Sequence, residues 1–149
     1  MKVEVMGDSE LKKIDNIDDR FIGQGERAAL SILKTVFGEE CEYKIQYLFA
    51  KLMKGDFLDT LSERQKKETL DIVVFRPVKP TIVFRIQDKH HDSILKTSQD
   101  VVQRQMLEWN GCQVVDLPHQ ECPTLWKDIV NEDSMEEVMF FLRKHDLIK

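Results

Sequence analysis

The stretch TIVFRIQDKHH, Thr81 to His91, decides how the fold is interpreted. Its first half is β-branched and aromatic, a composition that favours a buried strand. Its second half, from Gln87 to His91, is polar without a break. A strand that leaves a core usually ends in turn formers such as Gly, Pro or Asn, whereas these five residues include groups able to bind metals or phosphates. We therefore expect a functional site at the end of this strand.

The segment before this stretch, LDIVVFRP, predicts a short strand over residues 70–75. Pro77 and Pro80 close it, and the short gap before Thr81 suits a hairpin. The segment CQVVDLP, residues 112–118, predicts a further strand. Because a helix is expected between it and TIVFRI, these two strands should run parallel.

Helical periodicity marks three other segments. GERAALSILKTVFG predicts a helix that Gly38 ends. Residues 92–111 predict a second long helix that ends at Asn110-Gly111, and SMEEVMFFLRKH predicts a closing helix whose first turn holds a capping box, Ser134 with Glu137. The apolar residues expected on one face of the second helix are Ile94, Leu95, Val101, Val102, Met106 and Trp109.

The remaining segments are less regular. Alternation of Tyr43, Ile45 and Tyr47 predicts a strand, while residues 48–53 either continue it or turn helical. Residues 54–69 read as an irregular connection with a helical turn or two. The order helix, strand, strand, strand, helix, strand, helix predicts a single-domain α/β fold, a central mixed β-sheet flanked by helices. We assign residues 1–20 to a polar N-terminal arm and residues 21–149 to the domain.

Composition limits the functions. The 149 residues are 42% hydrophobic and 33% charged, enough for one core. A net charge of −5 argues against a surface that coats nucleic acid indiscriminately, although a local basic groove is compatible with it. No apolar run reaches the ~18 residues of a membrane span, and no signal-peptide pattern opens the chain, so a cytoplasmic protein is expected.

The cysteines allow one alternative site. Three cysteines without a CxxC pair fit reduced thiols. Cys112, His119 and Cys122 could supply three of the four ligands that a structural zinc site needs. The sequence leaves this open.

One set of polar residues follows a known order. Glu26 opens the first helix, Asp71 lies near the start of one strand, and Gln87 and Lys89 lie two apart at the end of the next. Over residues Gly25 to Pro118 this pattern resembles the restriction-endonuclease-like superfamily, with its Asp…(Asp/Glu/Gln)-x-Lys motif. It is similar in particular to very-short-patch-repair-like domains, through LDIVVF, TIVFRI, His91-Asp92, the second long helix and CQVVDLP.

The resemblance implies a Mg²⁺- or Mn²⁺-dependent endonuclease that hydrolyses DNA in repair, recombination or defence. Asp71 would be the principal metal ligand and Glu26 a second. Gln87 would offer its amide oxygen, and Asp88 its backbone carbonyl. Asp71 and Gln87 should then lie on adjacent strands with side-chain ends within ~4–6 Å.

Two positive groups complete the implied site. Lys89 would position the attacking water and stabilise the developing negative charge, and His91 would act as an acid or a phosphate contact. Arg85, Lys96 and Arg104 would add positive charge around the cleft. DNA is the implied partner, and a homodimer would cut both strands.

A second alignment leads to a different result. If His91-Asp92 is matched to the His-Asp pair of the repair-like subgroup, Arg85 and Gln87 stand where acids are expected. Only Asp71 then remains as a ligand, and the site is inactive. Two further classes therefore stay open: a catalytically impaired nuclease-fold module that binds nucleic acid or a protein partner, and an α/β interaction protein whose closing helix, FFLRKH, lies in a dimer interface.

Overall fold

The computed structural model describes residues 26–87, 94–118, 121–125 and 130–148. Its helices and strands follow the predicted order, with short helices in the region expected to be irregular. The elements are α2 (Glu26–Phe37), β1 (Glu42–Leu48), the 3₁₀ helix η2 (Phe49–Leu52), α3 (Asp56–Asp59), α4 (Glu63–Lys67), β2 (Thr69–Phe75), β3 (Ile82–Gln87), α5 (Ile94–Trp109), β4 (Gln113–Pro118) and α6 (Glu132–Lys144). The predicted N-terminal arm lies outside the described residues.

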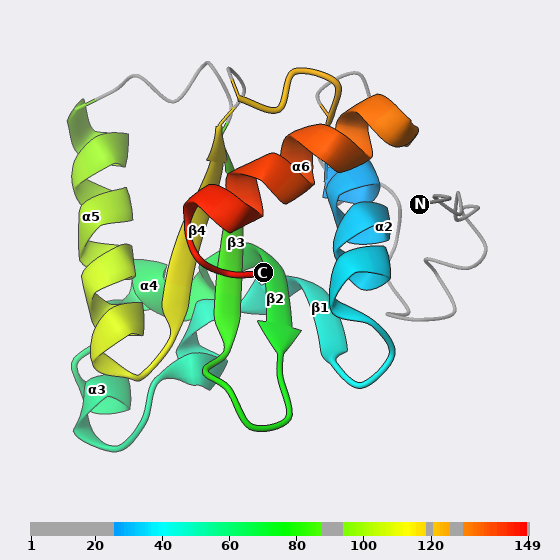
Figure 1. The fold of residues 1–149 in the computed structure, drawn as a ribbon. Helices are drawn as coiled ribbons and strands as arrows, with labels where there is room; N and C mark the ends of the chain where they lie inside the picture. Colours follow the sequence, from blue (N-terminus) through cyan, green and yellow to red (C-terminus); the bar gives the residue numbers. More distant parts are fainter. Residues whose placement is uncertain (1–25, 88–93, 119–120, 126–129, 149) are drawn as a thin grey trace.

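One four-stranded sheet organises the chain, in the order β1-β2-β3-β4. β1 pairs antiparallel with β2, β2 pairs antiparallel with β3, and β3 pairs parallel with β4. The predicted hairpin and the predicted parallel pair are both confirmed. α2 and α6 pack on one face of this sheet and α5 on the other (Figure 1), so the mixed α/β architecture with flanking helices is confirmed as well.

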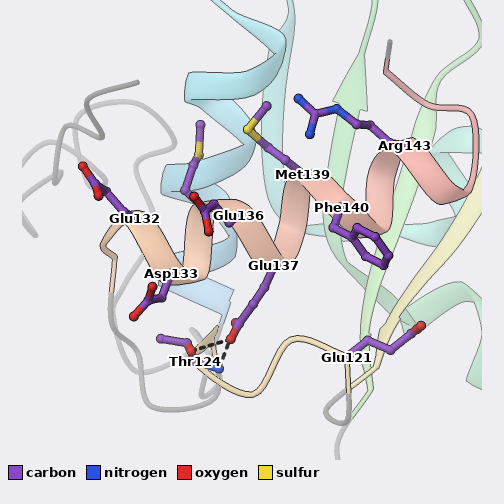
Figure 2. Close-up of a pocket in the computed structure, with 10 residues that line it drawn as sticks. Glu121, Thr124, Glu132, Asp133, Glu136, Glu137, Met139, Phe140 and Arg143 are labelled. Carbon is purple, nitrogen blue, oxygen red and sulfur yellow. Dashed lines mark hydrogen bonds between the residues drawn. The ribbon is translucent and has the colours of Figure 1, made fainter.

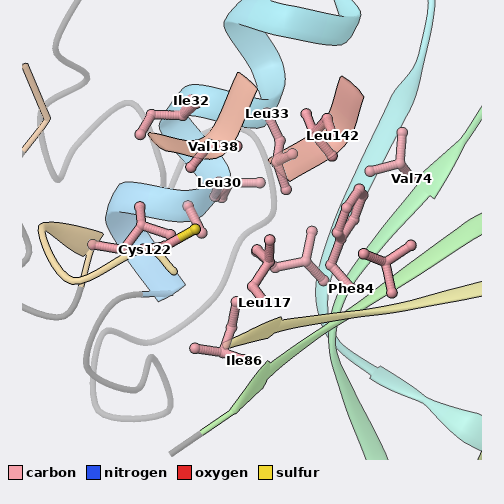
Figure 3. Packing of buried hydrophobic residues seen from close by; sticks show 14 of the residues in the cluster. Leu30, Ile32, Leu33, Val74, Phe84, Ile86, Leu117, Cys122, Val138 and Leu142 are labelled. Atoms are coloured by element: carbon pink, nitrogen blue, oxygen red, sulfur yellow. The ribbon is translucent and has the colours of Figure 1, made fainter. Parts of the chain in front are cut away.

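The face under α2 and α6 carries the larger core. Ile82, Phe84 and Ile86 of β3 belong to this cluster, together with Ile72 and Val74 of β2. Figure 3 shows Phe84 beside Leu33 and Leu142, which α2 and α6 contribute. β-Branched and aromatic residues at alternate strand positions explain this apolar face.

The face under α5 has a smaller apolar cluster, which includes Val83, Met106 and Leu107. The predicted apolar face of α5 is wrong in part, because Val101 and Trp109 are 59% and 61% exposed. The helix instead turns Arg104 and Leu107 toward the sheet, where Arg104 binds polar groups of β4. The face that α5 turns toward the sheet therefore includes a polar contact, which the spacing of apolar residues does not predict.

The helix ends follow local side-chain chemistry. Gly38 ends α2 as predicted, with φ of +86°, a value that glycine adopts without strain. The predicted capping box of α6 is wrong: Asn131 is the N-cap, its side chain accepts from Ser134 N, and the Ser134 hydroxyl accepts from Asn131 N. Among the described residues, no helix is both long and apolar enough to cross a membrane.

A candidate site at one end of the sheet

The predicted site residues belong to elements that meet at one end of the sheet. β3 and β4 end there, and β2, which is antiparallel to β3, begins there. Asp71 lies near the start of β2, and Gln87 is the last residue of β3. Asp88, Lys89 and His91 fall in the range 88–93, outside the described residues, as does the Gln87 side chain.

Asp71 lies where the pairing of β2 with β3 stops. The last pair of the ladder at this end is Ile72 with Phe84. Beyond it, the Asp71 carboxylate accepts a hydrogen bond from the backbone N–H of Ile86 at 2.8 Å. The Asp71 carboxylate thus takes the place of a backbone carbonyl as the acceptor for this N–H group. The half-buried Asp71 therefore already has a hydrogen-bond donor on the neighbouring strand.

Glu26 reaches the same end of the sheet from α2. It is buried, and its carboxylate accepts from the Gln46 amide at 3.1 and 3.4 Å. The Gln46 oxygen in turn accepts from the Thr69 hydroxyl at 2.9 Å. These bonds link Glu26 through β1 to the first residue of β2, two residues from Asp71.

Gln46 is a residue that sequence reasoning did not single out. It lies between the pairs Ile45–Ile72 and Tyr47–Leu70, and so opposite Asp71, and its φ is +48°. A positive φ is uncommon for a residue other than glycine and concentrates at functional sites. The alternation of side chains between the two faces of the sheet is also interrupted here. Ile45 belongs to the larger apolar cluster under α2 and α6, whereas Tyr47 packs against the smaller cluster under α5.

Arg85 lies on β3 between two residues that contact the start of β2. Phe84 before it is the last β3 residue paired with β2 at this end, and the backbone N–H of Ile86 after it donates to Asp71. Arg85 is only 8% exposed. Its guanidinium donates to both carboxylate oxygens of Asp116, Nε to Oδ1 at 2.6 Å and Nη2 to Oδ2 at 3.0 Å, and Nη1 donates to the carbonyl of Asp100 at 2.9 Å.

Arg104 joins the same network from α5. Its Nη2 donates to Asp116 Oδ2 at 2.5 Å and its Nη1 to the Val114 carbonyl at 3.1 Å. Burial alone would raise the pKa of Asp116, but the hydrogen bonds and charges of Arg85 and Arg104 outweigh it and hold that pKa below its ordinary value. Asp116 therefore stays ionised between two guanidinium groups.

This network bears on one expectation and adds one residue. Arg85 and Arg104 were expected to add positive charge around the cleft; both are bound to Asp116, whose carboxylate offsets one of their two charges. Asp116 itself was missed. Its only sequence signal was an acidic residue in the apolar run CQVVDLP, on the strand expected to run parallel to the one that holds Arg85.

Metal-ligand chemistry is sparse in the described part of the chain. No group of three His, Cys, Asp or Glu side chains able to hold a metal ion is found there. The zinc alternative also loses its geometry, because Cys112 and Cys122 are buried in separate hydrophobic clusters. Of the four predicted metal ligands, Glu26 and Asp71 are the two whose side chains are described. The carboxylate of each already accepts a hydrogen bond.

A sizeable cavity lies elsewhere, along the outer face of α6. It measures about 900 Å³, and Figure 2 shows Glu132, Asp133, Glu136 and Glu137 along the helix that lines it. Glu137 accepts from the backbone N–H and the hydroxyl of Thr124. Neither Glu26 nor Asp71, the predicted site residues with described side chains, is among the residues that line this cavity. Phe140, 70% exposed on the same helix, lies in the FFLRKH segment from which the sequence suggested a dimer contact.

Comparison with known proteins leaves the class to be argued from this geometry. No family model matches the chain, and no curated protein or solved structure gives a significant match.

Proposed function

We propose that this chain is a catalytically impaired, restriction-endonuclease-like module that binds DNA at the β3–β4 end of the sheet without hydrolysing it. The observation that carries the proposal is the position of Arg85. Arg85 is buried, is bound to Asp116, and directly precedes Ile86, whose backbone N–H donates to the Asp71 carboxylate. An arginine therefore stands at a position of β3 where the second alignment expects an acid.

The order of elements supports the nuclease-like part of the proposal. A helix that opens with Glu26, the strand that holds Asp71, the strand that ends at Gln87, a second long helix and a further strand follow one another in the order that the resemblance implies. The elements that carry Glu26, Asp71 and Gln87 reach one end of this sheet. Fold alone does not define function, so the residues at that end decide the chemistry.

Charge supports the impaired part of the proposal. Mg²⁺ is a hard cation that is bound through carboxylates and other oxygen ligands. Arg85, Arg104 and Asp116 together carry one net positive charge, and Arg85 lies on the strand next to Asp71; this charge opposes binding of a dication there. The alignment in which Arg85 and Gln87 stand where acids are expected predicts this outcome.

DNA binding by this edge would use the positive residues that follow β3. Lys89 and His91 come directly after the strand in the sequence, where the resemblance implies contacts with phosphates. With a net charge of −5 on the whole chain, binding would be local and sensitive to salt.

A metal-dependent endonuclease is the second candidate, and one observation favours it. Glu26 and Asp71, two of the expected metal ligands, are connected through the start of β2: Glu26 is linked by Gln46 to Thr69, and Thr69 lies two residues before Asp71. In that case Gln87 and the Asp88 carbonyl would complete the metal shell, and Lys89 would act on the attacking water.

One experiment separates the two candidates. Fluorescence anisotropy with a labelled 20-base-pair duplex measures binding, and gel analysis of the same samples with Mg²⁺ or Mn²⁺ measures cleavage. We expect binding without cleavage, and a loss of about threefold or more in affinity in Lys89→Ala. Lys44→Ala, which removes an exposed lysine paired with Glu42, is the matched control and should change binding little. Cleavage that disappears in Asp71→Ala would establish the endonuclease instead, and absence of any binding would refute both.

A further inference from the structure

A second polar region lies at the opposite end of the sheet. β3 and β4 are parallel, so the β2–β3 turn and the α5–β4 connection, which precede them, lie at the same end (Figure 1). These two segments and η2 enclose a cavity of about 310 Å³. It lies at the end away from Asp71 and Gln87.

Three lysines from three segments line this cavity. Lys51 belongs to η2, Lys54 follows it, and Lys79 lies in the β2–β3 turn. No aspartate or glutamate is among the lining residues. In the described part of the chain, none of the three lysines takes part in an ion pair, whereas Lys44, Lys66 and Lys144 each do.

Hydrogen bonds hold the segments that carry these lysines. The backbone N–H of Lys54 donates to the Asn110 side chain at 2.8 Å, which ties the segment after η2 to the end of α5. Arg76 Nε donates to the Pro80 carbonyl at 2.8 Å, and Arg76 Nη2 donates to Gln113 at 2.6 Å. The turn that carries Lys79 is thereby fixed to the start of β4.

Two of the ammonium groups are located by their neighbours. Lys51 Nζ lies 5.3 Å from the centre of the Tyr47 ring, and that ring packs edge-on against Phe75, which lines the cavity. Lys54 acts on Cys112, another lining residue: burial raises the pKa of this thiol, and the positive charge of Lys54 partly opposes the rise. The charge of Lys54 therefore acts on a residue of the cavity wall, and Lys51 lies over a ring that packs against another.

We propose that this cavity binds a phosphate group, carried by a nucleic-acid strand or by a free nucleotide. Three lysines line this small space, no carboxylate is among its described lining residues, and the mutual repulsion of the lysines is relieved when an anion enters. A phosphate group offers several acceptor oxygens to the three ammonium groups at once. The inference does not depend on the function proposed for the other end of the sheet.

Pyrophosphate, titrated calorimetrically at low salt, is the direct probe. We expect saturable binding by the wild-type chain and a loss of at least about tenfold in Lys51→Gln/Lys54→Gln/Lys79→Gln. The matched control is Lys44→Gln/Lys66→Gln/Lys144→Gln, which removes the same charge from lysines that are ion-paired on the surface. It should keep affinity within about twofold, and thermal melts establish that both variants fold.

A second arm identifies the source of the phosphate. If a labelled single-stranded 20-mer loses affinity and salt dependence only in the cavity variant, the phosphate belongs to a nucleic-acid strand. If only pyrophosphate binding is lost, it belongs to a free nucleotide. Equal losses in cavity and control variants, or no binding to the wild type, overturn the proposal. Lys89→Ala should leave pyrophosphate binding intact, which keeps this test distinct from that of the DNA-binding edge.

Discussion

The two faces of the sheet are built differently. The face under α2 and α6 is a continuous apolar cluster around Phe84. The face under α5 combines a smaller apolar cluster with a charged network in which Arg85 is buried and Asp116 and Arg104 are partly exposed. Buried ion pairs seldom stabilise a fold more than apolar residues of the same size would. The first face therefore accounts for stability, and the second holds charged groups at the end of the sheet where the candidate site lies.

The largest effect should come from the apolar face. Phe84→Ala removes a fully buried ring and should lower the free energy of unfolding by about 3–5 kcal/mol. Val83→Ala, the neighbouring residue on the α5 face, should cost about 2 kcal/mol because less volume is lost. Urea denaturation measures both, and a larger loss from Val83→Ala would reverse the assignment of the main core.

Removing only the carboxylate of the charged network should lower the free energy of unfolding almost as much. Asp116→Leu leaves the Arg85 guanidinium buried without its carboxylate and should cost about 3 kcal/mol. The double variant Arg85→Met/Asp116→Leu removes both charges and should stay within about 1 kcal/mol of wild type. If the double variant is as unstable as the single one, the network is a main source of stability and the contrast between the faces fails.

Acid should remove the contribution of the network. The pKa of Asp116 is depressed in the folded chain, so its stabilising effect is fully present above the unfolded-state value of about 4 and is lost as pH falls through the lower folded value. Below about pH 4, the free energy of unfolding of the wild type should therefore fall more steeply than that of Arg85→Met/Asp116→Leu. Parallel stability curves from pH 6 to pH 2 would show that Asp116 has no depressed pKa.

The smallest effect concerns the start of α6. Asn131→Ala removes the observed N-cap and should cost about 1 kcal/mol, while Asn131→Ser keeps a capping oxygen and should cost little. Thermal melts compare the two. Equal stabilities would mean that the cap does not hold α6 against the apolar face.

The order of elements could be predicted because it depends on local patterns. Alternation over Tyr43, Ile45 and Tyr47 and the proline-bounded run to Phe75 fix their strands within a few residues, and both form. The start of α6 was missed because Asn131 and Ser134 form a box as good as the one expected from Ser134 and Glu137.

The candidate site could be predicted only in part, because it depends on pairing between distant residues. Arg85 and Asp116 lie 31 residues apart, and only the register of β3 with β4 sets them opposite each other. The same applies to Gln46, whose bond to Glu26 spans 20 residues. The sequence shows which residues are candidates, but the register of the strands determines which of them lie side by side.

The most direct test of the account is a calorimetric titration of Mn²⁺ into the wild-type chain, Asp71→Ala and Gln87→Glu. Because an arginine stands at position 85, where the second alignment expects an acid, we predict no saturable site that depends on Asp71, and we predict that the added carboxylate of Gln87→Glu does not create one. Binding of about one equivalent of Mn²⁺ by the wild type, tightened in Gln87→Glu and lost in Asp71→Ala, would contradict the impaired-module account and establish the metal site of an endonuclease.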